Sequence, residues 1–145
     1  MTESTKASDI KREWHLVDIS DKILGRVSTE IAGLLMGKSK PYFVRNLDCG
    51  DYVVIINAKN VKVTGTKELN KSYFRHSGYP GGFKQENLGD LRDRKPNEII
   101  IRAVSGMLPQ NRLKAKMLSR LKVFEGAEHS FSEKFSKKGE AVITA

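Results

Sequence analysis

The segment DYVVIINA, residues 51–58, is the strongest indication of the fold class. Its unbroken apolar run at 53–56 is typical of a strand buried on both faces, as in a parallel sheet covered by helices. WHLVDI at 14–19 predicts an earlier strand. Between them, KILGRVSTEIAGLLMG at 22–37 spaces its apolar residues as one helix face does, at Leu24, Val27, Ile31, Leu34 and Leu35. Strand, helix and strand predict a right-handed βαβ unit.

The ends of this helix carry their own signals. Ser20 or Asp21 can cap its start, because their side-chain oxygens accept hydrogen bonds from free backbone N–H groups. Gly37 suits the cap at its end, and Pro41 prevents continuation.

Further elements follow along the chain. VKVTG at 61–65 predicts a third strand, residues 85–94 are weakly helical, and LKVF at 121–124 predicts a last strand. Pro96 opens a helix whose apolar stripe ends at Pro109, and it consists of Ile99, Ile100, Ala103, Val104, Met107 and Leu108. A second helix at about 110–120 buries Leu113, Met117 and Leu118.

The predicted fold class is α/β: a three-layer single domain with a short, mainly parallel sheet and helices on both faces. Three segments are expected along the chain. Residues 1–13 lack periodicity and form a flexible N-terminal arm, 14–129 form the domain, and 130–145 form an irregular C-terminal tail.

Composition restricts the class of protein. The chain has 145 residues, enough for one domain with a core, and a net charge of +9 with a pI of about 9.7. Such a charge favours a polyanionic partner, nucleic acid before a membrane surface, although a merely solvated basic surface is the alternative. A single Cys, Cys49, and no apolar run long enough to span a membrane make the cytoplasm the expected location.

The positive charge lies in two blocks. Residues 59–85 carry a net +5 with one acid, Glu68, and residues 99–124 carry +6 with no acid. A surface that serves only solubility mixes both signs. The two blocks therefore predict faces that meet phosphate groups.

The segment KSYFRHSGYPGG at 71–82 is unusual for a loop, because it joins three aromatic rings with three glycines and two cations. The glycines allow close approach to another surface, the rings Tyr73, Phe74 and Tyr79 can stack on bases or ribose, and Lys71 and Arg75 can neutralise phosphate. Alternatively, the rings fold inward and the glycines only make turns.

The second basic segment is NRLKAKMLSRLK at 111–122. Its cations surround a helix with an apolar side, and they are Arg112, Lys114, Lys116, Arg120 and Lys122. The alternative is an ordinary amphipathic helix, but a solvated face usually pairs opposite charges four residues apart. No acid lies between Glu98 and Glu125.

Motifs for catalysis or metal binding are weak. TGTKELNKS lacks the glycine and lysine spacing of a phosphate loop, and the glycines near Tyr79 do not follow the GxGxxG order. His76 and Ser77 are adjacent without a nucleophile elbow, so a hydrogen bond to phosphate or within the loop is the preferred role of His76. Asp48 and Asp51 are interpreted as fixing the turn before the strand. The chain is predicted to bind neither a metal ion nor a cofactor and not to be an enzyme, although a small nucleotide-dependent α/β enzyme is the rival hypothesis.

Several segments resemble one family, the bacterial large-subunit ribosomal protein thirteen family. They are LGRVSTEIAGLLMGKSKPYF at 24–43, DCGDYVVIINAKNVKVTGTK at 48–67, YFRHSGYPGG at 73–82 and AVSGMLPQNRLKAKMLSRLKVFEGAEH at 103–129. The resemblance implies an α/β fold, no catalysis and a structural role on large-subunit ribosomal RNA in the cytoplasm. After His129, HSFSEKF lacks the family's usual Pro, second His and Gln, so a C-terminal RNA contact is not transferred.

The combined expectation is a constituent of the large ribosomal subunit that stabilises its RNA during early assembly. Its partners are ribosomal RNA and neighbouring ribosomal proteins, and messenger RNA is a further hypothesis. The predicted RNA-binding residues are Lys38, Lys40, Arg45, Lys67, Lys71, Tyr73, Arg75, His76, Ser77, Gly78, Tyr79, Gly81, Gly82, Arg112, Lys114, Lys116 and Arg120.

Overall fold

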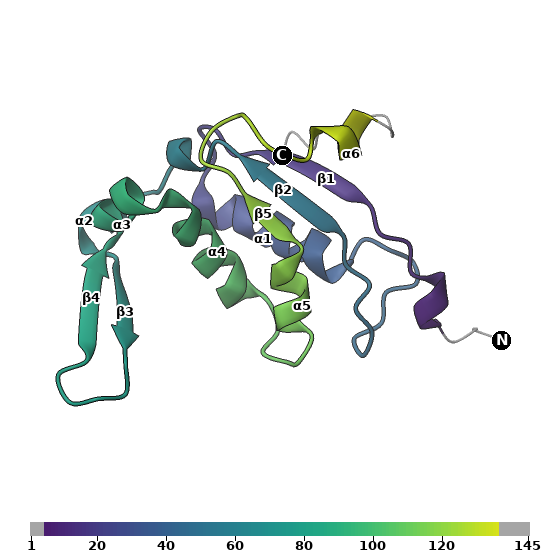
Figure 1. The fold of residues 1–145 in the computed structure, drawn as a ribbon, viewed down its shortest axis with the longest axis horizontal. Helices are drawn as coiled ribbons and strands as arrows, with labels where there is room; N and C mark the ends of the chain where they lie inside the picture. Colours follow the sequence, from purple (N-terminus) through teal and green to yellow (C-terminus); the bar gives the residue numbers. More distant parts are fainter. Residues whose placement is uncertain (1–4, 137–145) are drawn as a thin grey trace.

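A parallel three-stranded sheet lies at the centre of the protein (Figure 1). The computed structural model describes residues 5–136. The strand order is β1-β2-β5, with β1 at Trp14–Asp18, β2 at Tyr52–Ile56 and β5 at Leu121–Val123. Both pairings are parallel, and β2 is the middle strand, with Val53, Val54 and Ile55 fully buried. The predicted α/β class and the strand–helix–strand unit are confirmed.

Helix α1, Leu24–Met36, connects β1 to β2. Neither Ser20 nor Asp21 caps it, so that prediction is wrong: Ile23 is the N-terminal cap residue, and the Ser20 N–H and hydroxyl both donate to Asp18 Oδ1. Gly37 ends the helix as predicted. Its φ is 76°, its N–H donates to the Gly33 and Leu34 carbonyls, and a Cβ there would meet the Cys49 backbone, so only glycine fits.

The main core lies between one face of the sheet and two helices, α1 and α4 (Pro96–Met107). Pro96 occupies the first turn of α4, as predicted. Ile31 and Leu35 of α1, and Ile99, Ile100 and Val104 of α4, are almost completely buried. Met107 and Leu108 were predicted in the same stripe. Leu108 is buried as predicted, whereas Met107, the last residue of the helix, is 41% exposed.

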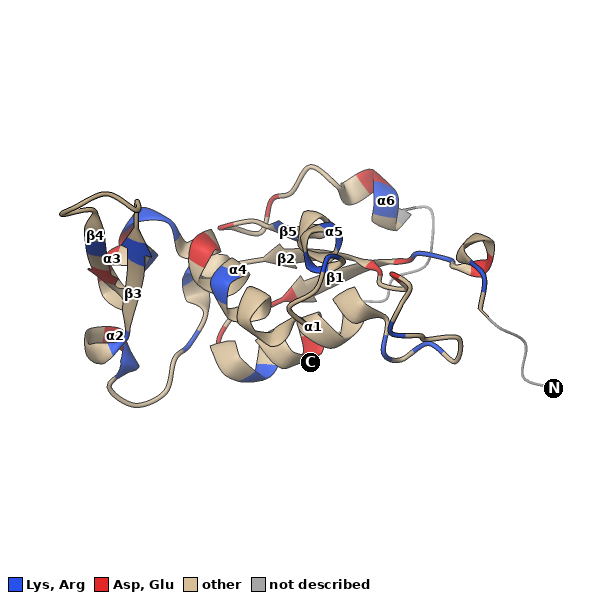
Figure 2. Ribbon diagram, turned by 90° about the horizontal axis from the view of Figure 1, so that it is seen from below, with Lys and Arg blue, Asp and Glu red and all other residues tan. Residues whose placement is uncertain are grey.

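The opposite face of the sheet is covered by the C-terminal segment (Figure 2). Trp14 of β1 stacks on Tyr52 of β2 with ring centroids 4.4 Å apart, and Phe131 lies 5.3 Å from Trp14. The short helix α6, Ser132–Ser136, adds the edge of Phe135 to this cluster. The segment predicted to be an irregular tail therefore contains a helix, and its residues 137–145 lie outside the described part of the chain.

Three further short helical segments are η1 at Ala7–Asp9, η2 at Ala58–Asn60 and α5 at Lys114–Ser119. The predicted helix at 110–120 is thus shorter than expected, and it buries Met117 while Leu113 and Leu118 stay half-buried. The predicted strand at 61–65 is wrong. Only one bridge forms there, Ile23 to Lys62, because η2 and the positive φ of Asn57 turn the chain away.

The segment predicted as a loop and a helix at 71–94 has a different structure. An antiparallel hairpin is formed by β3, Ser72–His76, and β4, Phe83–Asn87, between the helices α2, Lys67–Asn70, and α3, Leu88–Arg94. Sequence reasoning missed the strands because most of their side chains are exposed, so no alternation of buried residues marks them.

Candidate nucleic-acid interface

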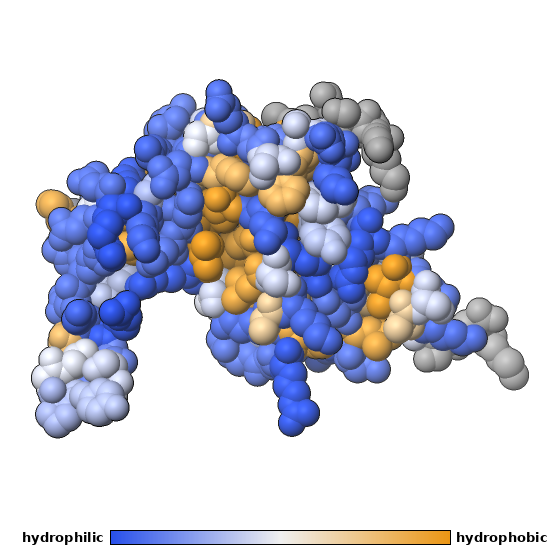
Figure 3. Space-filling view, in the orientation of Figure 1, coloured by the Kyte–Doolittle hydropathy of each residue, from blue (hydrophilic) through white to orange (hydrophobic). Residues whose placement is uncertain are grey.

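The β3–β4 hairpin extends away from the rest of the protein. Figure 3 shows it as a separate lobe with a hollow between it and the body. At its base, the Leu88 N–H donates to the Lys71 carbonyl, and α3 packs on α4. The free part of the hairpin therefore has backbone and side chains available to a partner on several sides.

The tip of the hairpin is a tight turn. The Gly82 N–H donates to the Tyr79 carbonyl at 2.9 Å, with Pro80 second and Gly81 third in the turn. Gly81 has a φ of 71°, which is the pattern of a type II turn, and Gly78 has a φ of 87°. The glycines thus form the turn itself, as the alternative interpretation held. His76 Nδ1 accepts from the Gly78 N–H at 2.9 Å, which confirms a hydrogen bond within the loop.

One face of the hairpin places like charges directly opposite each other. Arg75 of β3 is the cross-strand partner of Lys84 of β4, and both are exposed. Neither pairs with a carboxylate among residues 5–136. Opposed like charges destabilise a strand pair, so this arrangement favours binding of an anion between or above the two side chains.

The three aromatic rings of this segment have different surroundings. Tyr73 is half-buried between two cations, with Lys71 Nζ 5.6 Å and Arg102 Cζ 5.1 Å from its ring centre. Burial raises the pKa of Tyr73, although the Arg102 charge opposes it. Because Lys71 and Arg102 already lie over its ring, Tyr73 does not offer the free stacking face that was predicted. Tyr79 is 76% exposed, and Phe74, 62% exposed, stacks on Phe83.

The other predicted cations lie on two further protrusions. Lys38 and Arg45 are exposed in the loop at 37–50, and Arg112 is exposed in the turn before α5. In Figure 1 this loop, this turn and the hairpin all point downward, and Figure 2, seen from that side, shows them spread along the length of the molecule. Lys114 and Lys116 follow in α5, while Lys67 and Lys71 lie at the base of the hairpin.

Ion pairs are less frequent among the predicted cations than among the others, although some other cations of residues 5–136, Lys84 among them, are also unpaired. Six cations that were not predicted to bind RNA pair with carboxylates: Arg12, Lys59, Lys62, Arg92, Arg94 and Arg102. Of the ten predicted cations, only Lys40 and Arg120 do so within the described part of the chain. The remaining eight are without such a partner there, and they are Lys38, Arg45, Lys67, Lys71, Arg75, Arg112, Lys114 and Lys116.

The prediction that Lys40 and Arg120 bind RNA is corrected by the structure, because both side chains point into the protein. Arg120 is 6% exposed and forms a bidentate ion pair with Asp48, with Nη2 2.6 Å from Oδ1. Its Nη2 also donates to the Leu35 carbonyl, and a Cβ at Gly50 would meet both of these groups. Lys40 Nζ pairs with Asp51 and donates to the Cys49 carbonyl. Neither side chain is free to bind phosphate, so both are removed from the candidate surface.

Asp48 and Asp51 do more than fix a turn, because both form ion pairs with side chains from distant segments. Asp51 is 3% exposed, and its Oδ2 lies 3.0 Å from His15 Nε2. Burial alone would raise the pKa of Asp51, but hydrogen bonds from His15, Lys40 and the Glu13 N–H outweigh it and hold that pKa below its ordinary value. The network fixes the loop at 37–50 to the sheet and so positions Lys38 and Arg45. In the sequence, only Asp48 and Asp51 on either side of Gly50, just before the buried strand, indicated this network.

The described residues contain no group of three or more His, Cys, Asp or Glu suited to a metal ion. Within the same range, no helix has the length and apolar character needed to cross a membrane. The structure thus defines a class: a small basic α/β protein with a projecting hairpin and unpaired cations along one side.

The family within this class follows from comparison with known proteins. The model of the family described as Ribosomal protein L13 matches residues 12–130, and the chain belongs to this family. This match confirms the expected family. Members of the family are structural proteins rather than enzymes, so the hypothesis of a nucleotide-dependent enzyme is excluded.

Three relatives illustrate the similarity, and each is named large ribosomal subunit protein uL13. The protein from Dehalococcoides mccartyi is 61% identical, that from Alcanivorax borkumensis 51% and that from Citrifermentans bemidjiense 47%. Each alignment spans 128 residues, which is 88% of this chain and 90% of the relative.

Proposed function

We propose that the protein is a structural constituent of the large subunit of the cytoplasmic ribosome, where it binds and stabilises large-subunit ribosomal RNA. Family membership supports the ribosomal role. The RNA-binding surface, here called the basic edge, consists of the hairpin, the turn before α5 and the loop at 37–50. Its cations neutralise phosphates that would otherwise repel one another when the RNA compacts.

The Arg75–Lys84 pair carries this proposal. Two exposed cations are held opposite each other by a strand pairing, and the acids that line the same pocket, Glu86 and Glu98, pair with Arg94 and Arg102 instead. An Arg side chain can donate two parallel hydrogen bonds to one phosphate, and a Lys side chain adds a point charge beside it. RNA helices are recognised mainly through backbone shape and phosphates, which suits a projecting basic hairpin.

Crosslinking within intact large subunits tests the proposal. Ribosomal RNA should crosslink to peptides from the hairpin, from the turn at 108–113 and from the loop at 37–50. Peptides around Lys59 and Lys62 are the internal control, since both cations already pair with carboxylates. Crosslinks confined to such paired regions, with the hairpin free of RNA, would contradict the proposal.

The proposed screening of phosphates also bears on when the protein joins the large subunit and which proteins lie beside it. A protein that screens phosphate repulsion acts when the RNA first compacts, so we infer binding early in assembly, next to other large-subunit proteins. Neither the contacts of residues 5–136 nor the comparisons with relatives favour binding of messenger RNA.

A further inference from the structure

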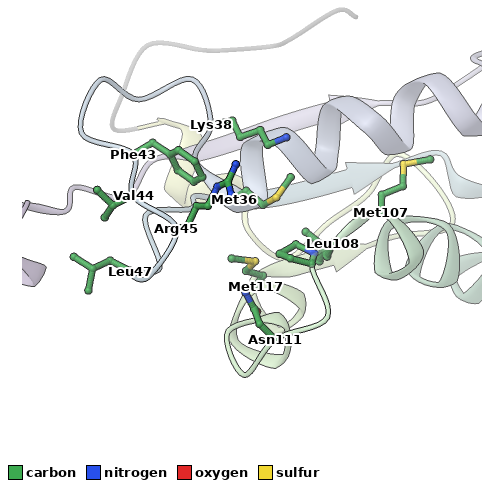
Figure 4. A pocket seen from close by; sticks show the side chains of 11 residues that line it. Met36, Lys38, Phe43, Val44, Arg45, Leu47, Met107, Leu108, Asn111 and Met117 are labelled. Atoms are coloured by element: carbon green, nitrogen blue, oxygen red, sulfur yellow. The ribbon is translucent and has the colours of Figure 1, made fainter.

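A cavity of about 440 Å³ opens between the loop at 37–50 and the turn before α5 (Figure 4). Its walls come from the end of α1, the loop at 37–50, the end of α4, the turn before α5, and Met117 of α5. The lining residues are Met36, Lys38, Phe43, Val44, Arg45, Leu47, Met107, Leu108, Pro109, Asn111 and Met117. A volume of this size is within the range of small-molecule binding sites.

The lining combines adaptable apolar side chains with positive charge. Three of the four methionines in the chain, Met36, Met107 and Met117, meet here. Thioether side chains are flexible and polarisable, and they adapt to flat or irregular groups. Phe43 adds a ring that is only half-buried. Two cations, Lys38 and Arg45, belong to the lining, and no carboxylate does.

This chemistry selects among possible occupants. The walls require an apolar or aromatic group, while the two cations require an anion within a few ångströms of it. An apolar side chain from a protein would satisfy the walls and leave both cations without a counter-charge. A nucleotide supplies both parts, because its base is flat and its phosphates carry negative charge.

We propose that the cavity receives one unpaired base that is turned out of the ribosomal RNA. The base stacks on Phe43, and the flanking phosphates contact Lys38 and Arg45. The Asn111 amide, whose oxygen already accepts from the Leu113 N–H at 3.1 Å, donates from its nitrogen to the base edge. This inference rests on the proposed function and adds a specific base-binding site to the phosphate contacts of the basic edge.

The test compares Phe43→Leu with Phe43→Tyr for binding to a transcript of large-subunit ribosomal RNA. Leu keeps apolar volume but removes the flat ring, and Tyr keeps the ring. We expect Phe43→Leu to bind roughly tenfold more weakly, and Phe43→Tyr to bind like the parent chain. Both affinities are expressed per folded molecule, with melting temperatures measured on the same preparations.

Salt dependence separates the base contact from the phosphate contacts. Loss of the ring removes no phosphate contact, so Phe43→Leu should keep the slope of log affinity against log salt. Arg45→Ala should make that slope shallower by about one phosphate equivalent. A Phe43→Leu variant that binds normally, while the parent chain shows a steep slope, overturns the base site and leaves the proposed function standing.

Ultraviolet crosslinking of the complex gives a second, independent measurement. A base inside the cavity should give a nucleotide adduct on a peptide that lines it, and Phe43→Leu should lose that adduct. If the parent complex yields adducts only on the hairpin, the inference is wrong, whatever the affinity of the variants. If the parent chain neither binds the RNA nor forms any adduct, the proposed function itself fails.

Discussion

At the scale of single residues, Arg75 and Arg120 carry the same guanidinium group in opposite surroundings. Arg75 is exposed and faces another cation, whereas Arg120 is buried and faces Asp48. Both lie in blocks of positive charge, so composition cannot separate them. Their difference arises from the carboxylates that the fold brings close, and for Arg120 that partner is 72 residues away.

Replacing Arg120 should therefore damage stability rather than RNA binding. Arg120→Ala leaves the mostly buried Asp48 with only Arg12, 3.5 Å away, as a charge partner. Breaking a buried pair on one side typically costs about 3–5 kcal/mol, and the partly exposed Arg12 offsets a share of that cost. Denaturant unfolding measures this loss, with Arg112→Ala as the exposed control, which should unfold like the parent chain. An Arg120→Ala protein of normal stability would show that the network does not hold the loop.

The Asp51 network should also make stability depend on pH. The pKa of Asp51 is lowered in the folded protein, so its contribution is complete above the ordinary aspartate pKa of about 3.9. The contribution is lost as pH falls from there through the folded-state pKa. We expect the unfolding free energy to fall as the pH drops below about 4. Asp51→Asn should be less stable than the parent chain at pH 7 and should lose less unfolding free energy at acid pH. If unfolding free energy falls equally steeply with decreasing pH in both proteins, the pH dependence comes from other carboxylates, such as Asp18, whose pKa is also lowered.

At the scale of elements, the hairpin is the part of the protein most directed toward a partner. Its tip turn depends on Gly81, whose φ of 71° strains any other side chain. A Gly81→Val change would distort the turn before it met RNA, so charge changes are the cleaner test. The Arg75→Ala and Lys84→Ala double variant removes two unpaired cations and no core contact.

We expect this double variant to bind ribosomal RNA about 10- to 100-fold more weakly, because charge-assisted hydrogen bonds to phosphate contribute ~1.5–3 kcal/mol each and do not add fully. Its melting temperature should stay unchanged or rise slightly, since the cross-strand repulsion disappears. Lys59→Ala is the matched control, an exposed cation that pairs with Glu125. Lower stability with unchanged affinity per folded molecule would make the hairpin a structural element only.

Helix α6 gives a separate prediction about the second face of the sheet. A chain ending at residue 129 would expose Trp14 and Tyr52, which now stack beneath Phe131. We expect a loss of about 1–3 kcal/mol in unfolding free energy and a red shift of tryptophan fluorescence. Unchanged fluorescence and stability would mean that this segment does not cover Trp14 in solution.

The elements differ in how far the sequence predicts them. The βαβ unit was predictable because Val53 to Ile55 and the α1 stripe are buried, and burial leaves an apolar pattern. The hairpin was not, because exposed strands leave none. The unpaired cations were predictable from the lack of nearby acids, whereas the inward turn of Lys40 and Arg120 depends on contacts between distant segments. The cavity was equally hidden, since its walls join residues 36–47 to 107–117.

At the scale of the whole molecule, the basic edge carries cations on three protrusions (Figures 1 and 2). The eight predicted unpaired cations and Lys84 lie on these protrusions or directly beside them. The Asp48–Asp51 network holds one of these protrusions, the loop at 37–50, against the sheet. Cations spread over three protrusions can contact several RNA segments at once, which is what stabilising a folded RNA requires.

The salt dependence of binding to large-subunit ribosomal RNA shows whether the basic edge binds phosphates. Each neutralised phosphate contributes a slope of about −0.7 to −0.9 in log affinity against log salt. If six of the nine cations, the eight predicted unpaired ones and Lys84, make contact, with Arg75 and Lys84 among the six, the parent chain should show a slope of roughly −4 to −5. The Arg75→Ala and Lys84→Ala variant should then show a slope shallower by about 1.4 to 1.8. A slope near zero, or one that these two substitutions leave unchanged, would contradict phosphate binding by the basic edge.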